Sequence, residues 1–175
     1  FLKAKNKLMV IFRGINLDFY NIQNISEAKK KKLITEWKID FNKFIILLPG
    51  RLTEWKGQEM FIESLNILRE DYNRSNFQAI ILGSNQGRKV YSKKLLSLVE
   101  RYRMGREIKF VDHCKEMPTG YALADLVVSS SIEPEAFGRI SVEAQAMKKL
   151  IVASNIGGSR ETIIDKKSGL LYKAG

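Results

Sequence analysis

Two glutamates stand eight residues apart in the stretch SSIEPEAFGRISVEAQAM, residues 130–147. Glu135 lies in a predicted loop just before Gly138, and Glu143 lies about one turn inside the amphipathic helix that follows. A carboxylate accepts two hydrogen bonds and therefore suits the vicinal hydroxyls of a ribose or a hexose. The helix start between the glutamates carries unpaired N–H groups, which favour an anion. The bland alternative is a pair of surface glutamates beside an ordinary helix cap.

Two cations, Arg51 and Lys56, stand five residues apart in the stretch GRLTEWKG (50–57), directly after an apolar run. Both side chains could reach one diphosphate, because Arg and Lys are the usual protein partners of phosphate. Surface cations are common, so Arg51 and Lys56 indicate a phosphate site only together with the helix start at Gly138. A ligand with hydroxyls, then phosphate, then hydroxyls is a nucleotide sugar.

Several common phosphate and metal motifs are absent from the sequence. No G-x-x-x-x-G-K-[ST] occurs and no G-x-G-x-x-G follows a predicted strand, which excludes a P-loop NTPase and disfavours dinucleotide binding. No Asp-x-Asp pair occurs, and His113 beside the single Cys114 has no further ligands to complete a zinc site. We therefore expect no metal site and no cofactor.

The elements that would position these residues are short apolar runs that alternate with helical patterns. Runs that are apolar on both faces, separated by helices, predict a parallel sheet covered on both sides. We expect an α/β, Rossmann-like, doubly wound domain of about six strands. The predicted strands are 44–50, 77–83, 107–111, 124–130, 150–154 and 169–172, and the predicted helices are 26–37, 57–71, 89–104, 118–124 and one after Gly138.

Ligands of doubly wound sheets bind beyond the carboxyl ends of the strands. Four glycine-bearing stretches follow predicted strands here: GRLTEWKG from Gly50, GSNQG from Gly83, SSSIEPEAFG to Gly138, and NIGGSRE with Gly157 and Gly158. Glycines allow a backbone to approach a ligand closely. We expect these loops to converge on one edge of the sheet.

The bulk composition excludes some classes of protein. The 175 residues are 45% hydrophobic, enough for one core, and no run of 18 or more apolar residues occurs. The lone cysteine fits a reducing compartment. Net charge is +11, and Lys29–Lys32 lie on the helix predicted from Ser26 to about Trp37. That face is either simply solvated or a patch for anionic lipid or an acidic substrate; nucleic acid is disfavoured, because no aromatic platform is interleaved.

The chain also suggests a division near residue 42. Residues 8–12 (LMVIF) resemble a strand of a preceding unit, so we expect residues 1–42 to be a linker and the end of an N-terminal domain. Residues 43–175 would form the nucleotide-sugar-binding domain. Because the chain starts with Phe1 and stops after GLLYKAG, we expect a fragment without a closing C-terminal helix.

Together, GRLTEWKG, EPEAFGRISVEAQAM and VASNIGGSRETI…SGLLY resemble the nucleotide-binding half of GT-B fold glycosyltransferases, in the large retaining family 4. The E-x7-E signature of that family matches Glu135 and Glu143. The resemblance implies that Arg51, Lys56 and Glu135 are the catalytic residues, and that Arg51 and Lys56 hold the diphosphate and neutralise the leaving group. It implies that Glu135 contacts the donor sugar and Glu143 the ribose, and that the backbone from Phe137 through Gly138 and Arg139 to Ile140 lines sugar and phosphate. The loop VDHCKE (111–116) would receive the base.

The resemblance further implies a hexosyl transfer from a nucleotide sugar to a glycan or lipid-linked acceptor, bound by an N-terminal domain, in surface polysaccharide or lipopolysaccharide synthesis. We expect a cytoplasmic protein, in which the lysine run Lys29–Lys32 would make a peripheral contact at the inner, anionic face of the membrane. This chain alone would be inactive. Two alternatives stay open: another GT-B enzyme, such as a phosphorylase or a sugar-phosphate synthase, and a non-catalytic module that binds sugar nucleotides or anionic membranes.

Overall fold

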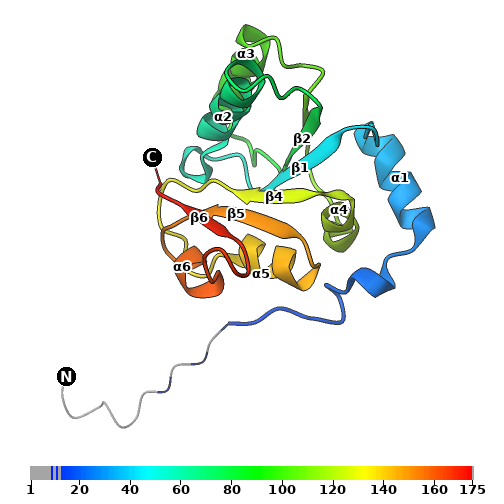
Figure 1. Cartoon of the computed structure of the whole chain (residues 1–175), viewed down its shortest axis with the longest axis vertical. Coiled ribbons are helices and arrows are strands. Elements are labelled where there is room, and N and C mark those ends of the chain that lie inside the picture. Colours follow the sequence, from blue (N-terminus) through cyan, green and yellow to red (C-terminus); the bar gives the residue numbers. More distant parts are fainter. Residues whose placement is uncertain (1–8, 10, 12, 175) are drawn as a thin grey trace, which may run out of the picture.

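The computed structural model describes residues 9, 11 and 13–174. Its centre is a six-stranded, all-parallel sheet with the strand order β3-β2-β1-β4-β5-β6 (Figure 1). The reversal of strand order at β1 and β4 is the topology of a doubly wound fold, so the predicted class is confirmed. The strands are β1 (Phe44–Pro49), β2 (Phe77–Leu82), β3 (Ile108–Val111), β4 (Leu126–Ser129), β5 (Leu150–Ser154) and β6 (Leu170–Tyr172). The strand predicted at 8–12 lies largely outside the described residues.

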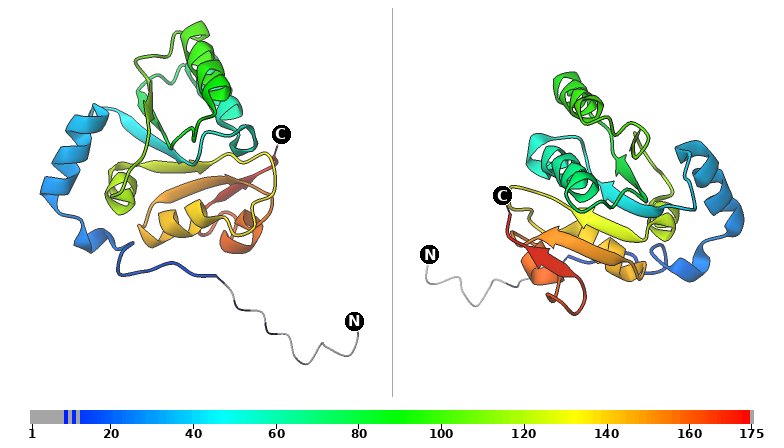
Figure 2. Two further views of the ribbon diagram at one scale, coloured as in Figure 1. Left: turned by 180° about the vertical axis from the view of Figure 1, so that it is seen from behind. Right: turned by 45° about the horizontal axis from the view of Figure 1, so that its top comes forward.

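Helices cover both faces of the sheet (Figures 1 and 2). On one face α2 (Gln58–Glu70) and α3 (Lys89–Arg101) pack on alternate residues of the central strands, such as Ile46 and Leu48. On the other face α1 (Glu27–Trp37), α4 (Met117–Leu123) and α5 (Arg139–Ala146) pack with Ile45 and Leu47. Short α6 (Ser159–Thr162) and the 3-10 turns η2 (Ile22–Asn24) and η3 (Glu54–Lys56) complete the chain. The two-sided burial explains why these strands read as unbroken apolar runs.

The observed helix ends differ slightly from the predicted ones. α3 ends at Arg101 rather than at Met104, because Arg103 adopts a left-handed conformation (φ 53°) and the Met104 N–H turns back to the carbonyl of Val99. This is a helix-terminating turn of the Schellman kind. α1 matches its prediction, and the hydroxyl of Ser26 caps it by accepting from the Lys29 N–H.

The segment before β1 packs on the same core as the sheet. Leu33 and Trp37 of α1 are each 6% exposed and belong to the cluster that contains β1 and β4. A Cβ atom at Gly120 in α4 would lie 2.8 Å from the Trp37 ring, so the glycine makes room for the indole. The boundary near residue 42 stays a prediction, but residues 20–39 share a core with the predicted nucleotide-binding domain.

The buried indole of Trp37 gives a test of this shared core. We expect Trp37→Ala to lower the free energy of unfolding by about 3–5 kcal/mol, because it removes a large side chain from a packed site. Urea unfolding followed by circular dichroism measures the change. Phe41→Ala is the control, since Phe41 is 64% exposed and should change stability by less than about 0.5 kcal/mol. A loss confined to α1 helicity, with the sheet unaffected, would contradict the shared core.

Candidate functional site

A cleft of about 520 Å³ opens at the carboxyl ends of the strands. We call it the strand-end cleft. The loops after β1, β2 and β3 line it together with Tyr20, α4, the 130–138 loop and α5. Eight residues predicted from the sequence line it: Gly50, Arg51, Lys56, Gly83, Glu135, Arg139, Ile140 and Glu143. The convergence of strand-end loops on one edge is what parallel topology requires.

Lys56 and Glu135 form one half of the polar lining. The Lys56 Nζ lies 2.5 Å from Glu135 Oε1, and the Ser131 hydroxyl donates to the same oxygen. The Lys56 and Glu135 side chains are only 11% and 15% exposed. The Lys56 ammonium also lies 4.5 Å from the centre of the Trp55 ring, within range of a cation–π contact. The carboxylate and the aromatic ring together hold the Lys56 ammonium in place at the end of η3, in the connection between β1 and α2.

Arg51 has an exposed side chain on a backbone that a hydrogen bond holds in place. Its side chain is exposed, whereas its carbonyl accepts a hydrogen bond from Gln58 Nε2 at 2.9 Å. Gln58 is fully buried and in turn accepts from the Tyr91 hydroxyl at 3.1 Å. This chain of hydrogen bonds ties the loop after β1 to α2 and α3. The exposed guanidinium is thus carried by a backbone that hydrogen bonds hold in place.

Glu143 forms the other half of the lining and is 5% exposed. Its Oε1 accepts from the Tyr20 hydroxyl at 2.7 Å and from Arg139 Nε at 2.6 Å. Its Oε2 accepts from the Tyr121 hydroxyl at 2.7 Å. Burial, and then the neighbouring Glu143 carboxylate, raise the pKa of Tyr20 to about 12; the same causes raise the pKa of Tyr121 well above its ordinary value. Both tyrosines therefore stay protonated hydrogen-bond donors at neutral pH.

The sequence did not predict Tyr20 or Tyr121 as site residues. Tyr20 is 123 residues from Glu143 in the chain, and nothing in LDFYN marks it. The position of Tyr121 could have been noticed in the sequence, since it lies in the short helix that leads into β4. β4 is one of the two strands at which the strand order of the sheet reverses. His113, Cys114 and Trp55 also line the cleft.

Gly157 and Gly158 lie behind the cleft and support its wall. A Cβ atom at Gly157 would be 2.4 Å from the Glu135 carbonyl oxygen, and one at Gly158 would be 2.2 Å from the carbonyl carbon of Phe137. The Gly158 N–H donates to the Glu135 carbonyl at 2.7 Å. Phe137 and Gly138 belong to the supported loop and are likewise absent from the cleft lining. The close approach that these glycines permit is to protein backbone in this structure.

The start of α5 faces the cleft at Arg139 and Ile140. Gly138 is its N-cap residue, with φ 69°, and no side chain caps the first turn. No acidic residue lies in that turn either. Among the described residues no side chain caps this turn, so its N–H groups fit the anion preference that the sequence suggested.

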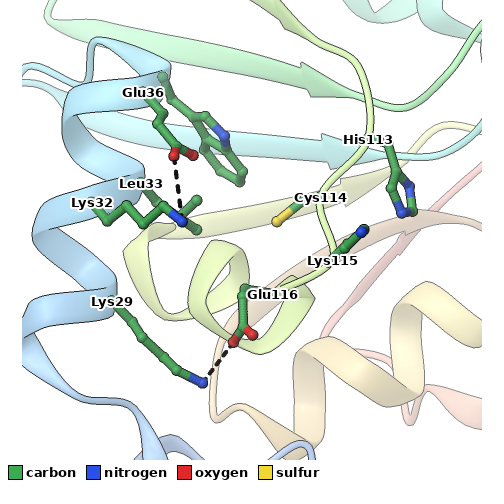
Figure 3. A pocket seen from close by; sticks show the side chains of 9 residues that line it. Lys29, Lys32, Leu33, Glu36, His113, Cys114, Lys115 and Glu116 are labelled. Carbon is green, nitrogen blue, oxygen red and sulfur yellow. Dashed lines mark hydrogen bonds and ion pairs between the residues drawn. The ribbon is translucent and has the colours of Figure 1, made fainter.

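A smaller cavity of about 260 Å³ adjoins the strand-end cleft between α1 and the loop after β3. His113 and Cys114 line both spaces, and the Cys114 thiol faces the smaller one (Figure 3). At its rim the Lys29 ammonium forms an ion pair with the Glu116 carboxylate, with 2.8 Å between Nζ and Oε2 (Figure 3). A second ion pair joins Lys32 and Glu36, with 3.8 Å between Nζ and Oε1 (Figure 3). Lys30 pairs with Glu27 at 2.7 Å, so acidic neighbours offset much of the lysine run.

Within the described residues, no three His, Cys, Asp or Glu side chains are grouped so as to hold a metal ion. The predicted lack of a metal site stays a prediction. Across the same residues no helix is long and apolar enough to span a membrane.

The support of the cleft wall by Gly158 can be tested with one methyl group. Gly158 has an ordinary helical backbone (φ −62°), so alanine there causes no backbone strain, and its Cβ atom would meet the backbone of Phe137 first. We expect Gly158→Ala to cost about 1–3 kcal/mol of stability, the usual penalty for overpacking. Gly105→Ala is the matched control, because a Cβ atom there would meet nothing within 4 Å. Equal melting temperatures for both variants would contradict the support.

The raised pKa of Tyr20 predicts a dependence of stability on alkaline pH. Its pKa is about 10 in the unfolded chain and about 12 in the folded one, so the protonated form stabilises the fold. That contribution is complete below pH 10 and is lost as the pH rises through 12. We expect unfolding free energy to fall more steeply over this window in the wild type than in Tyr20→Phe. Tyr72→Phe, at an exposed site, should behave like the wild type; identical slopes for all three would refute the expectation.

Known proteins resemble this chain in sequence and in fold. The family model described as "Glycosyl transferases group 1" matches residues 29–175. The chain is 32% identical over 133 residues to the D-inositol 3-phosphate glycosyltransferase of Paenarthrobacter aurescens, covering 73% of this chain and 31% of that protein. The chain spans about a third of the length of such curated relatives.

Two solved structures align closely. A glycosyltransferase from Rickettsia africae superposes with a TM-score of 0.92 at 33% identity, over 98% of this chain and 44% of that one. Anabaena HepE in complex with UDP and glucose superposes with a TM-score of 0.84 at 30% identity, over 95% of this chain and 43% of that one. The match over most of its length shows that the chain belongs to the glycosyl transferases group 1 family.

Proposed function

We propose that the chain is the donor-binding domain of a retaining GT-B glycosyltransferase of family 4. The observation that carries the proposal is the meeting of two cations, Arg51 and Lys56, with two carboxylates, Glu135 and Glu143, in one cleft. Anabaena HepE, which has a similar fold, was solved with UDP-glucose bound. A diphosphate needs the cations and sugar hydroxyls need the carboxylates, so the cleft offers both kinds of partner.

In the proposed complex Arg51 and Lys56 bind the diphosphate beside the first turn of α5. They neutralise the charge that develops on the leaving group when the sugar departs, which is electrostatic stabilisation of the transition state. Lys56 is held by Glu135, so a diphosphate that attracts the ammonium releases a carboxylate oxygen for the sugar hydroxyls. Glu143 takes the ribose. The base lies toward His113 and Cys114, where the cleft continues into the smaller cavity.

The reaction would transfer a hexosyl unit to a glycan or lipid-linked acceptor in surface polysaccharide synthesis. The acceptor would bind to an N-terminal domain, so the chain on its own binds donor and transfers nothing. We place the protein in the cytoplasm, with α1 touching the anionic inner face of the membrane. Because Lys29, Lys30 and Lys32 pair with acids, that contact would be weak.

Calorimetry with UDP, GDP, ADP and their glucose esters tests the proposal. We expect one nucleoside diphosphate to bind, and binding to persist in EDTA, because the cations of the protein neutralise the phosphates. Lys56→Ala should weaken that binding by about 1.5–3 kcal/mol, the range for hydrogen bonds to charged groups. Lys94→Ala is the control, since Lys94 is 59% exposed and pairs with Glu59 on the α2–α3 side.

Two results would count against the phosphate site. One is binding that disappears on chelation, which would require a metal. The other is equal binding by Lys56→Ala and Lys94→Ala. Failure of all three nucleotides to bind the wild type would overturn the proposed function itself.

A further inference from the structure

The Glu143 carboxylate has more partners than a helix carboxylate needs. Three donors reach it from three parts of the chain: Tyr20 before α1, Tyr121 in α4 and Arg139 one turn earlier in α5. All four residues line the strand-end cleft. A carboxylate offers about four acceptor positions, so three are filled before any ligand enters.

The two tyrosines that donate to Glu143 are held in place by burial and by packing of their rings. Tyr121 is fully buried and Tyr20 is 5% exposed. Their rings pack edge to face, with centroids 6.2 Å apart, and Phe19 packs edge to face on Tyr20 at 5.1 Å. Removal of either hydroxyl would leave a buried carboxylate short of a donor. Losing a hydrogen bond at a buried charge destabilises a protein more than losing one at an exposed charge. The tyrosines therefore fix where the Glu143 oxygens lie.

Arg139 differs from the tyrosines in exposure. Its side chain is 61% exposed, and it contacts Glu143 as an i,i+4 pair on one helix. Solvent therefore reaches the Arg139 guanidinium, whereas the two tyrosine hydroxyls lie in buried side chains, so a ligand that enters the cleft can displace the guanidinium without opening the core. The displaced guanidinium stays on the first turn of α5, where the diphosphate is proposed to bind.

We propose that Tyr20 and Tyr121 are positioning residues that hold Glu143 for the ribose, and that Arg139 is the partner that the ribose replaces. The inference rests on the proposed function. It makes the segment before α1 part of nucleotide recognition, because Tyr20 belongs to that segment. It also couples the two ends of the ligand: a nucleoside alone must displace Arg139 without compensation, whereas a diphosphate supplies the anion that Arg139 needs.

The experiment uses the nucleoside diphosphate among UDP, GDP and ADP that binds the wild type best, its 2′- and 3′-deoxy analogues, and its nucleoside. For Tyr20→Phe and Tyr121→Phe we expect the ribo-over-deoxy preference to fall by about 2- to 10-fold, the worth of one hydrogen bond. Affinity for the deoxy analogue that lacks the contacted hydroxyl should change little. Tyr102→Phe, on α3's side of the sheet, is the matched control and should keep the wild-type preference.

Arg139→Ala should change two affinities in opposite directions. The nucleoside should bind about 2-fold tighter, because its ribose no longer competes with the guanidinium. The diphosphate should bind about 5-fold weaker or worse, because a phosphate partner is lost. A merely structural arginine would weaken both ligands together.

Each outcome bears on the inference in a distinct way. A wild type that prefers ribo- over deoxy-ligand, with Tyr20→Phe and Tyr121→Phe keeping that preference in full, overturns the positioning role while the proposed function stands. If Arg139→Ala lowers the affinity for the nucleoside and for the diphosphate alike, the proposal that the ribose replaces Arg139 at Glu143 is wrong. A wild type that binds none of the three nucleotides removes the proposed function and this inference together. If one tyrosine variant does not fold, the other and Arg139→Ala still decide.

Discussion

The burial of the Glu143 carboxylate is the constraint on which the site depends. A buried charge without donors is unfavourable by several kcal/mol, so the fold must deliver hydrogen bonds to it. The donors come from the 16–25 segment, α4 and α5. That requirement fixes the path of the chain before α1, since Tyr20 must reach the carboxyl edge of the sheet. α1 then runs back beside α4, with Trp37 against Gly120.

The local pattern was sufficient to predict the sheet and the loops at its edge. β1 and β2 are short apolar runs stopped by Pro49 and Gly83, and such runs between helices admit few other arrangements. The spacing of Arg51 and Lys56 placed both at the end of β1, where the structure has them. These features depend on residues close in the chain, so a single sequence contains the information.

The tertiary partners of the glutamates could not be predicted from the same pattern. Ser131 is four residues from Glu135, but Lys56 is 79 residues away, and Tyr20 is 123 residues from Glu143. Which distant donor meets which carboxylate depends on how α4 and the first segment pack. Gly157 and Gly158 show the same limit. Their need for close approach was visible in the sequence, but that the backbone of the 134–138 loop approaches them was not.

The pairing inside the cleft explains how one site can accept both phosphate and hydroxyls. With no ligand, Lys56 neutralises Glu135 and Arg139 neutralises Glu143, so neither carboxylate is an isolated charge. A neutral sugar alone would have to break an ion pair to reach a carboxylate, and a diphosphate alone would have to draw a cation from one. A ligand that carries both groups would supply an anion to the cations and hydroxyls to the carboxylates at once. Under the proposed function, the ion pairs already present in the cleft would therefore favour the intact nucleotide sugar over its separate pieces.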